Sequence, residues 1–227
     1  MLFGGRSGDD ETVVAMLASA IRRDISFGVL PPDEKLKIEA LRQAYGGSNH
    51  SMRETLRMLA AEGLVEATSQ RGFRVMSATQ EDLEDILLMR LQAEQLGLKR
   101  AMARGDVAWE SRVVAAFHAL CRAEAAVVAG PDDVTALEWD EACRGASEAM
   151  LSACGSKRLI QMAGKFYNQS RRFRLALLRE GRIDFRARTE RLGKLQKAVL
   201  GRDEKEALAL LDDDIRADLG AGDRQHD

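Results

Sequence analysis

Basic side chains recur on one face of a short segment that follows Ser48. At 100° per residue three of them fall within an arc of about 60°: His50, Arg53 and Arg57. The opposite face carries apolar side chains, namely Met52, Leu56 and Leu59. Burial of the apolar face would leave the basic face in solvent. Such side chains bond to phosphates and base edges, so the pattern predicts a helix that reads the major groove of double-stranded DNA.

The residues at the start of this segment are polar and could add contacts to DNA. Ser48 can cap the helix and also donate a hydrogen bond to a phosphate. Asn49, His50 and Ser51 stand at the open N-terminus, where short side chains can reach the duplex. Gly63 then ends the helix, because glycine adopts the left-handed C-terminal conformation at little cost.

A hairpin is predicted directly after the helix. Residues 64–68 and 73–76 alternate as two short strands, and residues 69–72 join them as a turn. We expect Arg71 and Gly72 of this turn to form a wing beside the DNA. Lys37 and Arg42, which precede the helix, complete a local basic patch. Such a patch is sufficient for phosphate contacts even though the formal net charge of the chain is −2.

Other functions are compatible with parts of this pattern. An amphipathic helix and a hairpin occur in many small domains, and a winged helix can bind protein as an adaptor. A cysteine enzyme is a further alternative, since His118 lies three residues before Cys121 and Cys143 lies near Glu141. A thiolate nucleophile needs a base held by an orienting group. The sequence offers no strand-turn-helix elbow and no oxyanion loop, so we predict no catalytic residues.

Composition indicates a helix-rich globular protein. Of 227 residues 45% are hydrophobic, 5% are aromatic and 3 are proline. The three cysteines are an odd number without a CxxC motif. No apolar run suits an export signal or a membrane span. We therefore expect a cytoplasmic protein with reduced thiols.

The predicted elements fall into two domains. Residues 1–78 should form a winged helix-turn-helix, with helices at 9–27, 39–45 and from residue 49, and an extended stretch at 35–38. Residues 79–227 should form an all-α bundle, with helices from residue 82 and at 107–128, 133–153, 157–179, 184–200 and 203–219. The expected fold is mainly α, with the DNA-binding domain first and a helical effector-binding domain second.

Several motifs resemble the GntR family of bacterial repressors. They are Gly-Val-Leu-Pro-Pro at residues 28–32, Met-Arg-Glu-Thr-Leu at 52–56, Glu-Gly-Leu-Val at 62–65 and Arg-Gly-Phe-Arg-Val at 71–75. Asn49, His50 and Ser51 stand where the family usually has Arg-Thr-Pro. The resemblance implies DNA binding, with an operator that differs from the usual one. Ala-Cys-Gly-Ser-Lys-Arg-Leu at 153–159 resembles the FadR-type effector domain, also called FCD, and extends the likeness over nearly the whole chain.

Many effector domains of this branch hold a divalent metal with one Asp and three His. The resemblance places these four ligand positions on Cys143, Ser147, Leu192 and Asp214. None is a histidine, and leucine leaves the shell open. We therefore predict no metal and no cofactor. The alternative is that these are bundle residues that line the core.

We expect a small effector, with a carboxylate as the favoured class, to bind inside the bundle. The candidate side chains are Arg90, Glu94, Cys143, Ser147, Tyr167, Asn168, Arg171 and Asp214. Arginine grips carboxylates with two parallel hydrogen bonds. Two alternatives stay open: Arg90 could pair internally with Glu94 or Asp214, and residues 171–174 could be a solvated face. We expect Asp212, Asp213 and Asp214 to be mostly exposed.

The resemblance implies a ligand-responsive repressor. A single helix-turn-helix reads only a few base pairs, so specificity calls for a homodimer on a pseudo-palindromic operator. Effector binding would shift the population of DNA-binding states. No membrane partner is expected.

Overall fold

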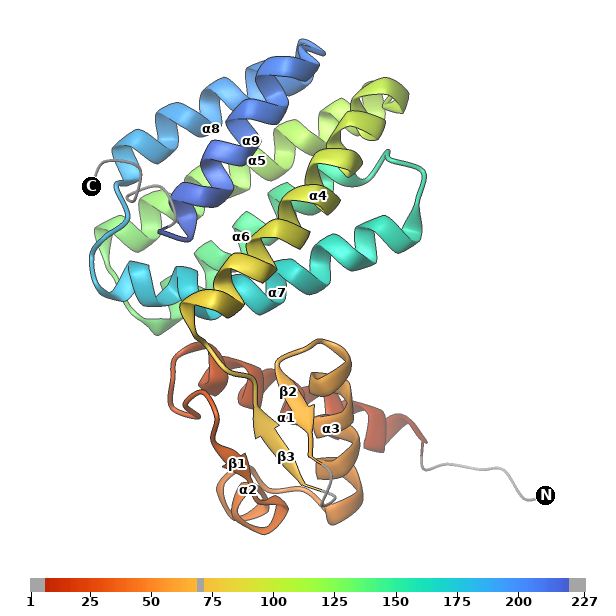
Figure 1. Ribbon diagram of the computed structural model, residues 1–227, viewed down its shortest axis with the longest axis vertical. Helices are drawn as coiled ribbons and strands as arrows, with labels where there is room; N and C mark the ends of the chain where they lie inside the picture. The colour runs from red at the N-terminus through yellow and green to blue at the C-terminus, as the bar shows by residue number, and fades with distance from the viewer. Residues whose placement is uncertain (1–6, 69–71, 221–227) are drawn as a thin grey trace, which may run out of the picture. The chain divides into compact units, whose positions relative to one another are not determined.

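The computed structural model describes residues 7–68 and 72–220, and for residues 7–11 the backbone alone. The chain divides near residue 82 into two compact units, each of which is described by itself. Figure 1 shows helices and a small sheet in the first unit and a bundle of long helices in the second. The predicted fold class, a winged helix-turn-helix followed by an all-α bundle, is confirmed.

The described part of the first unit combines three helices with a three-stranded antiparallel sheet. Its elements are α1 (Ser7–Ser26), β1 (Lys35–Leu36), α2 (Ile38–Tyr45), α3 (Asn49–Ala61), β2 (Val65–Ala67) and β3 (Phe73–Val75). The strand order is β1-β3-β2, with Lys35 opposite Arg74 and Val65 opposite Val75. Apolar side chains of α1, α3 and the strands form one core, in which Ile21, Met52 and Leu56 are fully buried. This core fixes which face of α3 is left for solvent.

Two glycines set the ends of the helices around α3. Gly47 has φ +81°, and a Cβ there would lie 2.9 Å from a methyl carbon of Leu17. The turn between α2 and α3 therefore needs glycine both for its backbone conformation and for space. Gly63 has φ +76° after α3, and the amide of Leu64 donates to the carbonyl of Leu59 at 3.0 Å. The predicted stop at Gly63 is confirmed.

The second unit contains six helices in the part of the chain that the structure describes. They are α4 (Gln80–Arg104), α5 (Val107–Ala129), α6 (Asp133–Leu151), α7 (Lys157–Arg179), α8 (Phe185–Leu200) and α9 (Glu204–Asp218). Helix α5 packs against α6 and α8, while α6 also contacts α7 and α8 contacts α9. None of the helices in 7–68 and 72–220 combines the length and apolar character that a membrane crossing requires.

Side-chain caps explain where the bundle helices begin. A carboxylate or hydroxyl accepts a backbone N–H at the start of each helix from α5 to α9: Asp106, Asp132, Ser156, Asp184 and Asp203. The predicted starts of α8 and α9 were one residue early because Asp184 and Asp203 are caps that precede the first helical residue. The predicted end of α6 was two residues late, since the chain turns at residues 152–155, where Gly155 has φ +72°.

Candidate DNA-binding and effector sites

Helix α3 presents the basic face that the sequence predicts. Met52, Leu56 and Leu59 have no exposed surface, whereas His50, Arg53 and Arg57 are exposed. Arg57 forms an ion pair with Glu54, one turn earlier on the same face. An exposed pair of this kind is weak, so a phosphate could compete for Arg57. No ion pair or side-chain hydrogen bond of Arg53 occurs among the described residues.

The start of α3 is closed by two serines. The Ser48 hydroxyl accepts the amide of Ser51 at 3.0 Å, and the Ser51 hydroxyl accepts the amide of Ser48 at 2.8 Å. This reciprocal pair is a capping box. Ser51 is buried, which corrects its prediction as a DNA contact: its hydroxyl serves the helix and faces the interior. Ser48 and Asn49 stay exposed.

Arg42 joins α2 to the start of α3. Its Nε donates to the carbonyl of Gly47 at 3.2 Å, and its Nη1 donates to Oδ1 of Asn49 at 3.3 Å. These bonds orient the Asn49 side chain beside the open N-terminus of α3. Lys37 directly precedes α2, and its side chain is exposed. Of the predicted turn residues, Arg71 lies outside the described residues and Gly72 accepts the amide of Thr68 at 3.0 Å.

Arg90 and Glu94 form a buried ion pair inside the bundle. Nε of Arg90 lies 2.6 Å from Oε1 of Glu94, one helical turn away on α4. The guanidinium also donates to the Ser170 hydroxyl at 3.1 Å and stacks 4.6 Å from the ring centroid of Tyr167. The hydroxyl of Ser147 donates to the other Glu94 oxygen at 2.9 Å. Of the two internal partners considered for Arg90, the structure shows Glu94.

Asp140 is the centre of a second buried cluster. Both Arg171 and Arg174 form ion pairs with its carboxylate, and the Tyr167 hydroxyl donates to its backbone carbonyl at 2.9 Å. Arg174 has no exposed surface. The alternative that residues 171–174 form a solvated face is therefore wrong for Arg171 and Arg174, because both form ion pairs with the buried Asp140 carboxylate of α6. Asn168 is half-buried on α7.

A third cluster surrounds Arg188, which the sequence analysis did not select. Its Nε and Nη2 lie 2.8 and 2.9 Å from the two oxygens of Asp218, and its Nη1 pairs with Glu124. Nη2 also lies 3.3 Å from the sulfur of Cys143. Its signal in the sequence is a charged residue within the apolar stripe of α8, where residues 188, 192, 195 and 199 share one buried face.

Asp214 belongs to this region and is buried, which corrects the expectation that it is exposed. Its carboxylate accepts a hydrogen bond from Nε of Arg191 at 2.9 Å. Burial, and next the neighbouring charge of Asp218, raise the pKa of Asp214 to about 6, while Arg188 and Arg191 oppose the rise. Contact with the Arg188 guanidinium lowers the pKa of Asp218 against the effect of its burial. Of the two carboxylates on α9, Asp214 thus bonds to Arg191 and Asp218 bonds to Arg188.

The four positions that the resemblance assigns to a metal do not form a suitable donor set. Leu192 is buried and apolar, the Cys143 sulfur faces the Arg188 guanidinium, and Arg191 holds Asp214. Ser147 bonds to Glu94 instead. Within the described residues no group of three or more His, Cys, Asp or Glu is arranged to hold an ion. The residues present do not fit the family's metal.

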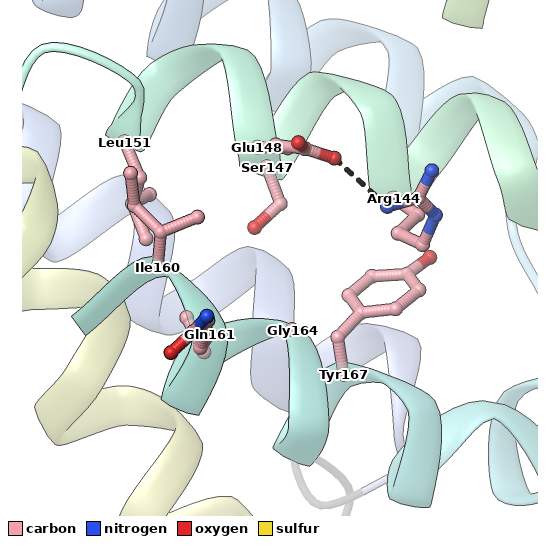
Figure 2. Close-up of a pocket in the computed structure, with 9 residues that line it drawn as sticks. Arg144, Ser147, Glu148, Leu151, Ile160, Gln161, Gly164 and Tyr167 are labelled. Carbon is pink, nitrogen blue, oxygen red and sulfur yellow. Dashed lines mark hydrogen bonds and ion pairs between the residues drawn. The ribbon is translucent and has the colours of Figure 1, made fainter. Parts of the chain in front are cut away.

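Six predicted ligand-binding residues line a small inner cavity of about 30 Å³: Arg90, Glu94, Cys143, Ser147, Tyr167 and Asp214. This volume holds a water or two, since one water needs roughly 10–15 Å³ by the same measure. Ser147 and Tyr167 also line a larger cleft of about 230 Å³ between α6 and α7, here called the α6–α7 cleft. Figure 2 shows both helices contributing to it, with Gly164 on α7 opposite Ser147. Asn168 and Arg171 line neither space.

The alternative cysteine chemistry has no supporting geometry. Burial raises the pKa of the Cys143 thiol well above its usual value. A reactive thiolate needs the opposite shift. His118 and Cys121 lie on the exposed side of α5, and no bond joins them in the described structure.

The sequence and the fold match known regulators. Residues 14–75 match the bacterial regulatory proteins of the gntR family, and residues 85–217 match the FCD domain. The transcriptional repressor GlaR of Escherichia coli K12 is 32% identical over 194 residues, which cover 84% of this chain and 87% of GlaR. BphR of Paraburkholderia xenovorans LB400, an uncharacterized HTH-type transcriptional regulator, is 31% identical over 191 residues that cover 84% of this chain and 77% of BphR.

Solved structures show the same fold at lower identity. Escherichia coli McbR/YncC has a TM-score of 0.72 at 17% identity and covers 92% of this chain and 95% of its own. A GntR regulator from Rhodococcus sp. RHA1 has a TM-score of 0.69 at 22% identity and covers 92% and 99%. The three-helix unit with its hairpin and the all-α second unit agree with both solved structures. The chain belongs to the GntR family of bacterial transcriptional regulators, with an N-terminal helix-turn-helix DNA-binding domain and a C-terminal FCD effector-binding domain.

Proposed function

We propose that the chain is a homodimeric repressor whose α3 helices bind the two half-sites of a pseudo-palindromic operator. A small metabolite in the bundle releases it from DNA. One observation carries the DNA-binding part: three fully buried apolar side chains fix α3 so that His50, Arg53 and Arg57 face solvent together. Asn49, oriented by Arg42, extends this face at the helix start. The repressor role is proposed by similarity to GlaR, which is named a transcriptional repressor.

In this proposal the DNA contacts divide into two kinds. His50, Arg53 and Asn49 reach base edges, where a good bidentate contact contributes about 1–3 kcal/mol of discrimination. Lys37, Arg42, Arg57, the Ser48 hydroxyl and the wing at Arg71 and Gly72 hold phosphates and set the register. We place the domain boundary after residue 78, because the amide and hydroxyl of Thr79 both donate to Asp82 at the start of α4.

The test compares Arg53→Ala with Arg112→Ala, an exposed arginine of α5, on the promoter fragment upstream of the protein's own gene. Fluorescence anisotropy should show Arg53→Ala binding about tenfold or more weakly, while Arg112→Ala binds as the wild type does. Affinity of the wild type should fall steeply with salt, because phosphate contacts release counterions. Unchanged affinity in Arg53→Ala would contradict the assignment of α3. Absence of any salt-dependent DNA binding would favour the protein-binding adaptor.

We place the effector in the inner cavity and the α6–α7 cleft, which share Ser147 and Tyr167. A Cβ at Gly164 would meet nothing within 4 Å, so the cleft has room beside Ser147. Separation of α6 and α7 would join the two spaces and bring Arg90 and Glu94 within reach of a ligand. An anionic effector stays a proposal. Because Arg90 and Arg171 each pair with a carboxylate of the chain, a ligand carboxylate would have to exchange with one of those partners.

A further inference from the structure

A third space in the bundle borders the Arg188 cluster. It has a volume of about 300 Å³ and lies between the start of α8 and the end of α9. We call it the α8–α9 pocket. Arg188 and Asp218 line both this pocket and the inner cavity, so their ion pair forms a shared wall. Ser147 and Tyr167, which border the α6–α7 cleft, do not line it.

Guanidinium groups dominate the polar lining of the α8–α9 pocket. Arg182, Arg188 and Arg191 face two carboxylates, and both carboxylates are already engaged. Asp184 accepts the backbone amides of residues 186 and 187, both at 3.0 Å, as the cap of α8. Asp218 is gripped by Arg188 through two bonds. The lining itself holds three guanidinium groups against two carboxylates, and Glu124, Asp214 and Glu180 pair with the same arginines from outside the lining. The N-terminus of α8 adds positive potential on the pocket side.

Arg191 is the group with bonding capacity left. Its Nε donates to Asp214, but its Nη2 lies 3.8 Å from Asp218, which is too long for a hydrogen bond. Among the described residues no hydrogen bond of either Nη atom of Arg191 occurs. The side chain is 19% exposed and lines the pocket, so a ligand in the pocket can reach it. Among residues 7–68 and 72–220, Arg182 pairs only with Glu180, at 3.2 Å, and both side chains are about half exposed.

The remaining lining is apolar and the space is small. Leu177, Ile183, Ala187 and Ala217 contribute aliphatic surface beside the arginines. A volume of about 300 Å³ stands at the lower end of the range for small-molecule sites. A carboxylate matches the planar fork of an arginine, and a short aliphatic group would fill the apolar side.

We propose that the α8–α9 pocket is a separate binding site for a small aliphatic carboxylate, which Arg191 and Arg182 bind in front of the Arg188–Asp218 pair. The proposal goes beyond the effector cleft between α6 and α7, and it does not depend on DNA binding. It names Arg191 as the residue that selects the charge of the ligand and Ala217 as the residue that limits its size.

The test uses hexanoate as the probe on the full chain, with hexan-1-ol and hexylammonium as neutral and cationic probes of equal length. Titration calorimetry should detect binding of hexanoate alone, and the arginine Nε–Hε resonances of Arg191 should shift in ¹⁵N NMR spectra. Arg191→Gln and Ala217→Phe should each weaken hexanoate by about tenfold or more. The matched controls Arg186→Gln and Ala209→Phe change exposed residues of the same two helices outside the pocket and should bind hexanoate as the wild type does.

Each other result overturns the proposal. Equal binding of hexan-1-ol would mean that the arginines do not select charge. Loss of binding in Gly164→Leu but not in Ala217→Phe would place hexanoate in the α6–α7 cleft. Absence of hexanoate binding in a wild type that still binds DNA would remove this site and leave the regulator assignment intact. Arg191→Gln also removes the hydrogen bond to Asp214 and could therefore fail to fold. Ala217 is exposed, so Ala217→Phe tests the pocket independently of that bond.

Discussion

The buried carboxylate of Asp214 should lower the free energy of unfolding as pH rises from about 4 to about 6, the opposite of what an ion-paired carboxylate with a lowered pKa does. Its pKa is raised to about 6 because it is buried and lies beside Asp218 on the same helix. Around it lie Arg188 and Arg191 of α8, Cys143 of α6 and the Arg90–Glu94 pair of α4. Asp214→Asn removes the titrating group and nearly preserves its shape. Comparison of this variant with the wild type therefore isolates one proton.

The sign and size follow from the shift. Between the unfolded pKa near 3.9 and the folded value, the native state binds more protons than the unfolded chain, so the free energy of unfolding falls as pH rises. A difference of about two pH units corresponds to roughly 3 kcal/mol, fully present below about pH 4 and lost above about pH 6. Asp218 has a lowered pKa. The stability that ionised Asp218 contributes is therefore lost only below about pH 4, as pH falls.

Urea unfolding followed by circular dichroism should measure this effect. The free energy of unfolding of the wild type, less that of Asp214→Asn, should fall by about 3 kcal/mol between about pH 4 and about pH 7. Asp213→Asn, an exposed neighbour, should show no such trend. A constant difference between the wild type and Asp214→Asn would refute the assignment of a raised pKa. The direct check is the titration of the Asp214 carboxyl carbon by NMR, with a midpoint near 6.

Three further comparisons, each of two substitutions, test capping and packing by urea unfolding. Ser48→Ala should cost about 1 kcal/mol, because the cap of α3 is lost. Ser111→Ala, at an exposed residue of α5, should change stability by less than about 0.5 kcal/mol. Equal effects would contradict the role of the cap. Asp140→Asn should cost about 3–5 kcal/mol, since Arg174 keeps a buried charge without its partner. Glu148→Gln, which breaks an exposed pair with Arg144, should cost under about 1 kcal/mol. Similar losses in these two variants would show that burial does not decide the cost. Gly164→Ala should stabilise α7 by about 0.5–1 kcal/mol, while Gly97→Ala should destabilise, because its Cβ would lie 2.8 Å from Leu151. The reverse order would contradict the packing described.

The first unit was predictable from local sequence because its signals are local. The spacing of Met52, Leu56 and Leu59 defines the buried face of α3, and Gly63 defines its end. The hairpin follows from alternation over a few residues. Ser51 shows the limit of this reasoning: its position at the helix start indicated a contact with DNA, but its hydroxyl closes the cap.

The bundle helices were also predictable, whereas the contacts inside the bundle were not. Helix periodicity and capping residues locate α5 to α9 within two residues. Pairing among Arg174, Asp140, Arg188 and Asp218 depends on which helices meet, and no pattern within one helix specifies that. The exposed position expected for Asp214 was wrong for this reason, since its partner Arg191 lies on another helix.

The Arg188 guanidinium fixes the longitudinal register of the bundle. It bonds to Glu124 on α5 and Asp218 on α9, and it touches Cys143 on α6, so one side chain of α8 links three neighbouring helices. A slip of α8 by one turn would move this charge about 5.4 Å and leave buried carboxylates without a counterion. Sliding between these helices is therefore costly, and a ligand would transmit its effect by tilting or separating them as intact rods.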